Sequence, residues 1–265
     1  TADLNGKAVE MACNAIAGRL KDVAGEMLSS QPSGIELKDG MVWVKDQQAD
    51  LSWNDLVLTA YIKRISLSEH AHYATPKIRY DATIEKGHPF AYHVYGTAIT
   101  TVTVDCLRGI YEVDAVKIVH DFGASMNPIV DLGQIEGGLV QGIGWMTLEE
   151  IIYDKQGKLL SNALSTYKIP DIYSVPKNIE VSFLETPNDN PAIMRSKAVG
   201  EPPLMYGMGT FFALRNAIKE FNPKGSPAFS APMTPEKVLC ALYSQSPEVK
   251  HANNEEAIGN MAINK

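Results

Sequence analysis

The amino-terminal part of the chain carries apolar residues at helical spacing. They recur every three or four positions between residues 7 and 20, which predicts a helix there. A short apolar run at Met41–Val44 follows Asp39-Gly40 and predicts a hairpin-like segment. The run from Ser52 to Asp55 has the form of a capping box with Asp in place of Glu or Gln. It predicts that a second helix begins there and continues through Ile65.

The period changes to two over residues 92–105, where threonines alternate with apolar residues. This alternation predicts a strand, Glu112–His120 predicts a second one, and the turn at residues 107–109 makes the pair an antiparallel hairpin. Further strands are predicted at Met146–Asp154 and Ile179–Leu184. Helices mixed with hairpins, rather than regular βαβ units, predict an α+β fold.

A helix is predicted to begin at Asn127-Pro128, with Asn as the N-cap and Pro at the first position. One apolar face is formed by Ile129, Leu132, Ile135, Leu139 and Ile143. The same helix contains Gly133, Gly137, Gly138 and Gly142. Each glycine costs about 1 kcal/mol relative to alanine, so we expect close packing against another backbone or a ligand. Pro202-Pro203 predicts the start of a last long helix, Met205–Phe221, and the tail after Ser244 is predicted to be loose.

Charge and cysteine usage narrow the classes of function. The chain of 265 residues has 24 Lys+Arg against 31 Asp+Glu, a net charge of −7. This acidity disfavours nucleic acid and anionic membrane surfaces as partners. No apolar run reaches the length of a membrane span. Three scattered cysteines without CxxC spacing predict no metal site built by this chain alone and favour a cytoplasmic, reducing compartment.

The most unusual stretch surrounds Glu201, which stands between Gly200 and two prolines. The prolines fix two φ angles, so this carboxylate is presented rigidly at the start of a helix. Two interpretations compete, a functional carboxylate and a helix-start glutamate stabilised by the macrodipole, and the residues alone favour the second. Gln134 among its glycines offers donors and an acceptor that suit the edge of a heterocycle, or else caps backbone in a tightly packed helix.

Three weaker signals receive little weight. His70 and His72 hint at a metal, but no further ligand spacing supports one, and a solvated loop explains them better. Asp121 opens a DFG triplet without the rest of a kinase. Thr1 at the first position also fits the interpretation as an N-terminal-threonine hydrolase. The helix predicted so soon after it disfavours that interpretation. Because the chain starts at Thr1 and not at Met, we expect a processed chain or part of something longer.

These stretches together resemble the xanthine dehydrogenase/xanthine oxidase family of molybdenum hydroxylases, in the C-terminal half of the molybdopterin-binding subunit. The resemblance covers roughly residues 1–240 and is carried by Ala2–Gly6, Ser66–Ser68, Tyr95-Gly96, Asn127-Pro128, Gly133–Gly137, Gln141-Gly142, Ser165–Pro170, Ser196–Pro203 and Thr234–Glu236. It implies that residues 1–245 are the C-terminal portion of a molybdopterin-binding domain, as one body or two subdomains, and that residues 246–265 are a polar tail.

The resemblance implies an oxidoreductase of purine catabolism that hydroxylates an N-heterocycle such as xanthine or hypoxanthine with water-derived oxygen. Glu201 matches the general base that takes a proton from a molybdenum-bound hydroxide. Gln134 matches the glutamine that hydrogen-bonds the pterin. Thr1 and Ala2 fall at the end of a small-residue loop that holds the cofactor, and Gly200 lies beside the base together with Lys197 and Val199.

Other family features are absent from this sequence: the glycine-rich cofactor loop, the substrate-contacting residues and the Cys-rich Fe–S domains. The resemblance therefore implies a heteromeric, cytoplasmic complex with the N-terminal part of the molybdenum subunit and with Fe–S and FAD subunits. The cofactor is molybdopterin-Mo in its plain or cytosine dinucleotide form. Two alternatives stay open: a relative acting on another heterocycle or an aldehyde, such as a nicotinate dehydrogenase, and a non-catalytic assembly subunit.

Overall fold

The computed structural model describes residues 2–184, 190–225 and 227–244. They form two compact units. The first takes in residues 2–92 and 190–195, and the second takes in the remaining described residues. Thr1 and the predicted tail over residues 246–265 lie outside the described residues.

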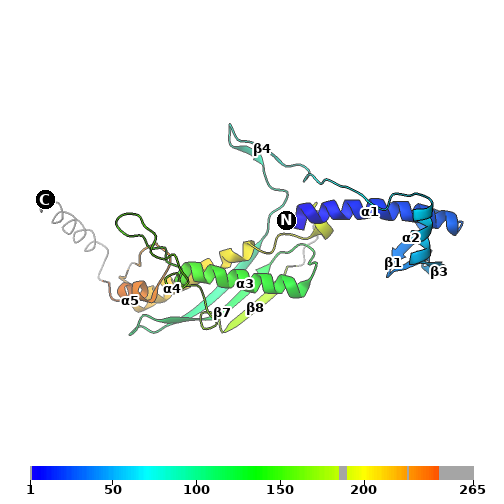
Figure 1. Cartoon of the computed structure of the whole chain (residues 1–265). Helices are drawn as coiled ribbons and strands as arrows, with labels where there is room; N and C mark the ends of the chain where they lie inside the picture. The colour runs from blue at the N-terminus through cyan, green and yellow to red at the C-terminus, as the bar shows by residue number, and fades with distance from the viewer. Residues whose placement is uncertain (1, 185–189, 226, 245–265) are drawn as a thin grey trace. The chain divides into compact units, whose positions relative to one another are not determined.

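The first unit begins with a long helix followed by a small sheet (Figure 1). Its elements are α1 (Ala2–Met27), η1 (Pro32–Gly34), β1 (Ile35–Lys38), β2 (Met41–Val44), β3 (Gln47–Ser52), α2 (Trp53–Ile62), β4 (Arg79–Asp81), β5 (Lys86–His88) and η2 (Ile193–Arg195). Strands β1, β2 and β3 form one antiparallel sheet, and β4 pairs with β5. The predicted strand at Met41–Val44 is confirmed, whereas the first helix extends beyond the predicted residues 7–20 at both ends.

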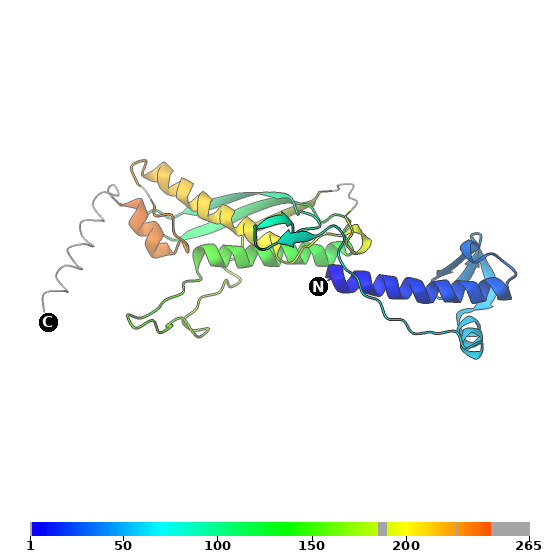
Figure 2. The same cartoon turned by 90° about the horizontal axis from the view of Figure 1, so that it is seen from above.

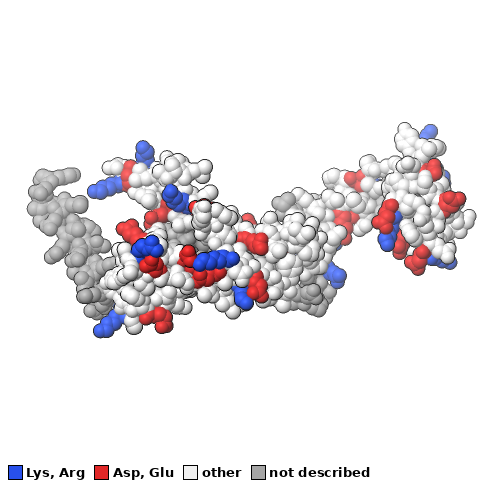
Figure 3. All heavy atoms as spheres, turned by 90° about the horizontal axis from the view of Figure 1, so that it is seen from below, with Lys and Arg blue, Asp and Glu red and all other residues white. Residues whose placement is uncertain are grey.

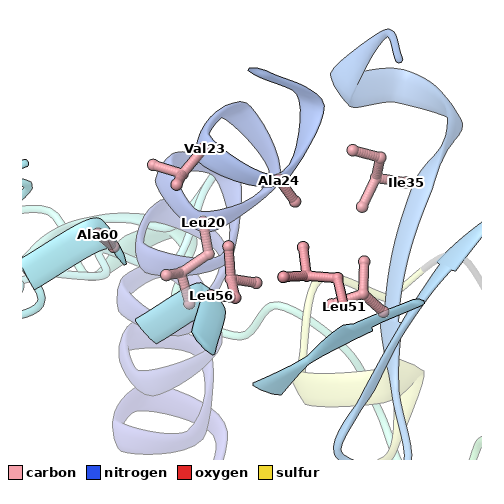
Figure 4. Packing of buried hydrophobic residues seen from close by; sticks show 8 residues of the cluster. Leu20, Val23, Ala24, Ile35, Leu51, Leu56 and Ala60 are labelled. Carbon is pink, nitrogen blue, oxygen red and sulfur yellow. The ribbon is translucent and has the colours of Figure 1, made fainter. Parts of the chain in front are cut away.

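The core of the first unit lies where α1 and α2 meet the small sheet (Figure 4). Leu20 and Ala24 of α1 pack with Ile35, Leu51 and Leu56, and all five are buried. The helix start predicted at Ser52 is confirmed, because the Ser52 hydroxyl accepts a hydrogen bond of 3.1 Å from the Asp55 amide and donates one of 2.6 Å to the Asp55 carboxylate. This cap fixes the start of α2 against the end of β3.

The second unit is built on a sheet in the order β6-β7-β8. Its elements are β6 (Gly96–Val104), β7 (Tyr111–His120), α3 (Pro128–Thr147), β8 (Asn178–Phe183), η3 (Pro202–Gly207), α4 (Met208–Phe221) and α5 (Pro235–Leu242). The antiparallel hairpin predicted from the alternating pattern is confirmed, with Gly96 opposite His120 and Val104 opposite Tyr111. Strand β8 pairs with β7 in parallel, so β7, α3 and β8 make one βαβ unit within the α+β fold.

Helices α3 and α4 cover one face of this sheet (Figure 2). Ile135, Leu139 and Ile143 of α3 pack on Val116 and Ile118 of β7. Farther along, α4 and α5 pack on the end of β6 through a second cluster of buried side chains, which includes Phe211, Leu214, Ile218, Val238 and Leu242. The sheet thus presents the carboxyl end of β7 beside the amino-terminal half of α3.

Three sequence predictions need correction. The strand predicted at Met146–Asp154 is wrong, because α3 continues through Thr147 and Met146 packs into the core with α4. The last long helix begins at Met208 rather than Met205, because the 3-10 helix η3 occupies residues 202–207. Of the predicted apolar face of α3, Ile129 is 84% exposed and Leu132 is 37% exposed, so only the later turns are buried.

The described part of the chain contains no helix that is long and apolar enough to cross a membrane. On the face drawn in Figure 3, acidic and basic side chains are interspersed rather than gathered in a basic patch.

Candidate functional site

Glu201 is the N-cap residue of η3, with Pro202 at the first position of that 3-10 helix. Its backbone angles are φ −101° and ψ −36°, and Pro202 and Pro203 restrict the chain that follows. The residue is exposed, and its side chain makes no capping hydrogen bond. The structure therefore places this carboxylate at a rigid turn without using it to hold the helix start.

Gln134 and Gly200 come together although they belong to distant segments. Gln134 is exposed on α3, and a methyl group placed on Gly200 would lie 3.5 Å from the Gln134 side-chain oxygen Oε1. Gly200 immediately precedes Glu201, so an amide and a carboxylate flank the same glycine. An amide offers two donors and an acceptor, which matches the edge of a nitrogen heterocycle.

The four glycines that the sequence analysis singled out in α3 divide into two pairs with different surroundings. Gly138 and Gly142 face η3, and a side chain on Gly142 would overlap the carbonyl oxygen of Leu204. Gly133 and Gly137 face open space, because a methyl group added to either would have nothing within 4 Å. The latter two line a hollow of about 620 Å³ with residues such as Ile169. The prediction of close backbone packing is thus met by the first pair only.

Ala2 is the first residue of α1, is exposed, and belongs to the first unit. Thr1 lies outside the described residues. The site geometry therefore rests on Gln134, Gly200 and Glu201.

A buried ion pair supports the loop that leads to Glu201. The Lys197 ammonium lies 2.5 Å from the Asp121 carboxylate, and their side chains are only 9% and 2% exposed. The Lys197 amide donates a hydrogen bond of 2.6 Å to the carbonyl oxygen of Phe122. Gly123 and Ser196 form an adjacent β-bridge. These contacts fix the loop against the segment that follows β7.

A second buried polar pair lies next to the first. The Nδ1 atom of His120, the last residue of β7, lies 2.5 Å from the hydroxyl oxygen of Tyr206 in η3. Burial lowers the pKa of His120, and the neighbouring Asp121 carboxylate opposes that shift in part. Burial together with the Asp121 charge raises the pKa of Tyr206. Both shifts favour the neutral forms, so this is a pair of uncharged hydrogen-bonding groups.

Sequence reasoning gave no role to His120, Asp121 or Tyr206, and Lys197 entered only as a neighbour of the base through the family resemblance. Their pairing spans 76 and 86 residues, so no local spacing reveals it. One signal in the sequence could have revealed the ion pair: Asp121 follows directly after an apolar strand, where burial is expected. An aspartate at such a position needs a partner.

No metal-ligand cluster is found within the described ranges: no group of three or more His, Cys, Asp or Glu side chains lies close enough to hold an ion. His72 is exposed, as expected of a solvated loop, and His70 lies beside it in the same loop. Cys13, Cys106 and Cys240 are free thiols.

Comparison with known proteins identifies the family. The family model of the molybdopterin cofactor-binding domain matches residues 1–176. The chain therefore belongs to the family of molybdopterin cofactor-binding domains, in agreement with the resemblance found in the sequence.

Named relatives of the chain include a xanthine dehydrogenase/oxidase and an aldehyde oxidase. The chain is 40% identical over 250 residues to xanthine dehydrogenase/oxidase of Felis catus and 35% identical over 244 residues to aldehyde oxidase 1 of Bos taurus. These alignments cover 92% and 91% of this chain but only 17% of each relative. The chain thus corresponds to one part of much longer proteins.

Solved structures confirm the fold. Quinoline 2-oxidoreductase from Pseudomonas putida 86 matches with a TM-score of 0.71 at 24% identity, over 88% of this chain and 28% of that one. The aldehyde oxidoreductase from Desulfovibrio desulfuricans matches with a TM-score of 0.59 at 30% identity, over 69% of this chain and 19% of that one.

The residues of the second unit fit one side of a pterin-type cofactor. Gln134 presents an exposed amide, and the neighbouring Gly133 borders open space, since a methyl group there would have nothing within 4 Å. Gly200 leaves the backbone bare at the point where a methyl group would lie 3.5 Å from the Gln134 Oε1 atom. A planar ring with nitrogen donors and acceptors needs this combination of an amide and a bare backbone.

Proposed function

We propose that this chain supplies the general base and part of the cofactor-binding surface of a molybdenum hydroxylase. Its substrate class is an N-heterocycle such as xanthine or hypoxanthine, hydroxylated with oxygen derived from water. The observation that carries the proposal is the convergence of the Gln134 amide on Gly200, directly before the exposed carboxylate of Glu201.

Each residue has a separate task in this proposal. When bound, the molybdenum cofactor supplies the redox chemistry and accepts two electrons from the substrate. Gln134 holds the cofactor by hydrogen bonds from its amide, and Gly200 lets the ring approach the backbone. Glu201 accepts a proton on a carboxylate oxygen from the attacking oxygen atom, as a general base within hydrogen-bond reach.

The environment of Glu201 supports the role of a base. The residue is exposed at a turn stiffened by two prolines, and no capping hydrogen bond engages its carboxylate. A carboxylate held in one place reacts more readily than a mobile one, because less orientational entropy is lost when it reacts. A non-catalytic assembly subunit has no need of such a presentation.

Several finer points belong to the same proposal. The higher identity to a xanthine dehydrogenase/oxidase (40%) than to an aldehyde oxidase (35%) supports a purine substrate. Coverage of only 17% of these relatives supports partner domains or subunits that carry the rest of the molybdenum subunit, Fe–S clusters and FAD. Three free cysteines support a cytoplasmic, reducing compartment. The cofactor is molybdopterin in its plain or its cytosine dinucleotide form.

The test is Glu201→Gln in the complete enzyme that contains this chain. The substitution keeps the size of the side chain and removes its ability to take a proton, so turnover of xanthine should fall about 100- to 10,000-fold. The molybdenum content should stay close to the wild-type value. Both quantities come from steady-state kinetics and metal analysis of one preparation.

The matched control is Glu236→Gln. Glu236 is also an exposed glutamate next to a proline at the start of a helix, where it follows Pro235 in the first turn of α5. The control should leave turnover unchanged. Retention of more than a tenth of the activity in Glu201→Gln would refute the assignment of the base. Full turnover with aldehydes or nicotinate but not with purines would assign the site to the alternative substrate class.

A further inference from the structure

Two consecutive residues at the end of β7 each bond to a different flank of Glu201. Asp121 contacts Lys197, four residues before Glu201, and His120 contacts Tyr206, five residues after it. These contacts join segments that are 76 and 86 residues apart in the sequence. Both contacts start from the carboxyl end of β7, the central strand of its sheet.

The upstream contact is strong because it is shielded from water. Lys197 and Asp121 are at least nine-tenths buried, and the Lys197 ammonium lies 5.5 Å from the centroid of the Tyr95 ring. Asp121 itself is held, since its other carboxylate oxygen accepts a bond of 2.9 Å from the Gly123 amide. Its own amide donates to the carbonyl oxygen of Tyr95 at 2.9 Å. An ion pair in this setting is costly to break, because one charge would remain buried without a partner.

The downstream contact is shaped by the strand next to β7. His120 is completely buried, on the same face of β7 as Ile118. The hydroxyl of Tyr206 reaches it over Gly96 of β6, where any side chain would overlap the tyrosine. Its ring also meets the His120 ring edge-on, with centroids 5.7 Å apart. Tyr206 therefore has one packed position, which fixes η3 and the turn before it.

We propose that His120 and Asp121 act as positioning residues for Glu201, holding the two flanks of its turn through Tyr206 and Lys197. We name this group of four side chains the β7 clamp. That this positioning matters for catalysis rests on the proposed function of Glu201. That the four side chains restrain the turn does not depend on that function. Disruption of the β7 clamp moves the carboxylate without changing its chemistry.

The mechanical part is tested by hydrogen exchange in the complete enzyme. The double variant Lys197→Met/Asp121→Asn removes both charges together, so that no unpaired charge remains buried and folding is preserved. Peptides that contain residues 196–204 should exchange at least about tenfold faster, because the hydrogen bond from the Lys197 amide to the Phe122 carbonyl oxygen opens more often. Peptides from α3 should be unchanged.

The catalytic part is tested by kinetics of the same double variant and of Tyr206→Phe. Each should lower kcat and kcat/KM alike, about 10- to 100-fold, since a displacement of about 1 Å is enough for such a loss. KM and the molybdenum content should stay near wild type. A merely structural role would instead lower the amount of folded, loaded enzyme at unchanged kcat per molybdenum.

Matched controls separate the β7 clamp from general perturbation. Lys117→Met removes an exposed ion pair with Glu180 on the same sheet, and Tyr111→Phe removes another tyrosine hydroxyl bond on β7, to the carbonyl oxygen of Met233. Both should leave exchange of residues 196–204 and kcat unchanged.

The outcomes separate the two proposals. Normal exchange of residues 196–204 in the double variant would overturn the β7 clamp, and faster exchange with unchanged kcat would overturn its role in positioning Glu201 for catalysis. Active Glu201→Gln would overturn the proposed function while leaving the exchange result to decide the mechanical holding. An inactive Glu201→Gln together with fully active clamp variants would refute the β7 clamp alone.

Discussion

Gly142 of α3 and Gly207 of η3 pack backbone against backbone, so closely that a side chain on Gly207 would overlap the main chain of Gly142. Through this contact the helix that carries Gln134 and the short helix that begins after Glu201 behave as one packed layer. The two candidate site residues are thereby held at a fixed separation by main chain, which has little freedom to adjust.

Gly142→Ala is expected to destabilise the protein. Although alanine favours a helix by about 1 kcal/mol, its methyl group would overlap the carbonyl oxygen of Leu204, and backbone cannot rotate away as a side chain can. The net free energy of unfolding should fall by about 1–3 kcal/mol, measured by denaturant unfolding. Gly18→Ala in α1, where nothing lies within 4 Å, should instead raise stability slightly. Equal effects of the two substitutions would contradict the packing described.

Gln134→Met should weaken retention of the cofactor while leaving the fold intact. Each lost hydrogen bond is worth about 0.5–1.5 kcal/mol, which corresponds to a roughly two- to tenfold weaker affinity. The measurement is molybdenum per protein after extended dialysis. Gln141→Met, on the same helix two turns on, is the matched control and should retain molybdenum as wild type does. If both variants lose molybdenum equally, the assignment of Gln134 fails.

Acidification should weaken the second unit through His120. Burial lowers the pKa of this histidine in the fold, so the unfolded chain takes up the proton more readily. The free energy of unfolding therefore has its full value above about pH 6.5 and falls as the pH drops toward the lowered pKa, by at most about 1.4 kcal/mol per pH unit.

His120→Asn should remove this part of the pH dependence, as measured by unfolding between about pH 5 and 8. The exposed His72 provides the control variant His72→Asn, which should keep the wild-type profile. Identical profiles for wild type and His120→Asn would show that the histidine does not couple protonation to folding.

Local patterns were sufficient to predict several elements of the fold. The alternation of threonine and apolar residues predicted β6, and the Asn127-Pro128 pair predicted the start of α3, where the Asn127 side chain accepts a bond from the Val130 amide. The segment after Met146 was predicted wrongly as a strand. A short apolar run has no period of its own, and here Met146 packs with α4 at the end of α3 whereas Ile151 and Ile152 are exposed.

The candidate site was predictable only in part. Glu201 and Gln134 stand out because prolines and glycines surround them in the sequence. Their approach across Gly200, the parallel pairing of β8 and the buried Lys197–Asp121 pair all join distant segments. Such contacts depend on tertiary packing, and they produce no regular pattern of residues along the sequence from which they could be predicted.

The β7 clamp closes loops of 76 and 86 residues, and these lengths affect when the site forms during folding. Loops of this length close late and at a considerable cost in chain entropy. The turn at Glu201 is therefore complete only when the sheet, α3 and η3 have all assembled. A ligand that binds this completed arrangement alone will stabilise it by mass action, in proportion to the logarithm of its concentration over Kd. Binding of such a ligand and completion of the fold are therefore thermodynamically coupled, and each favours the other.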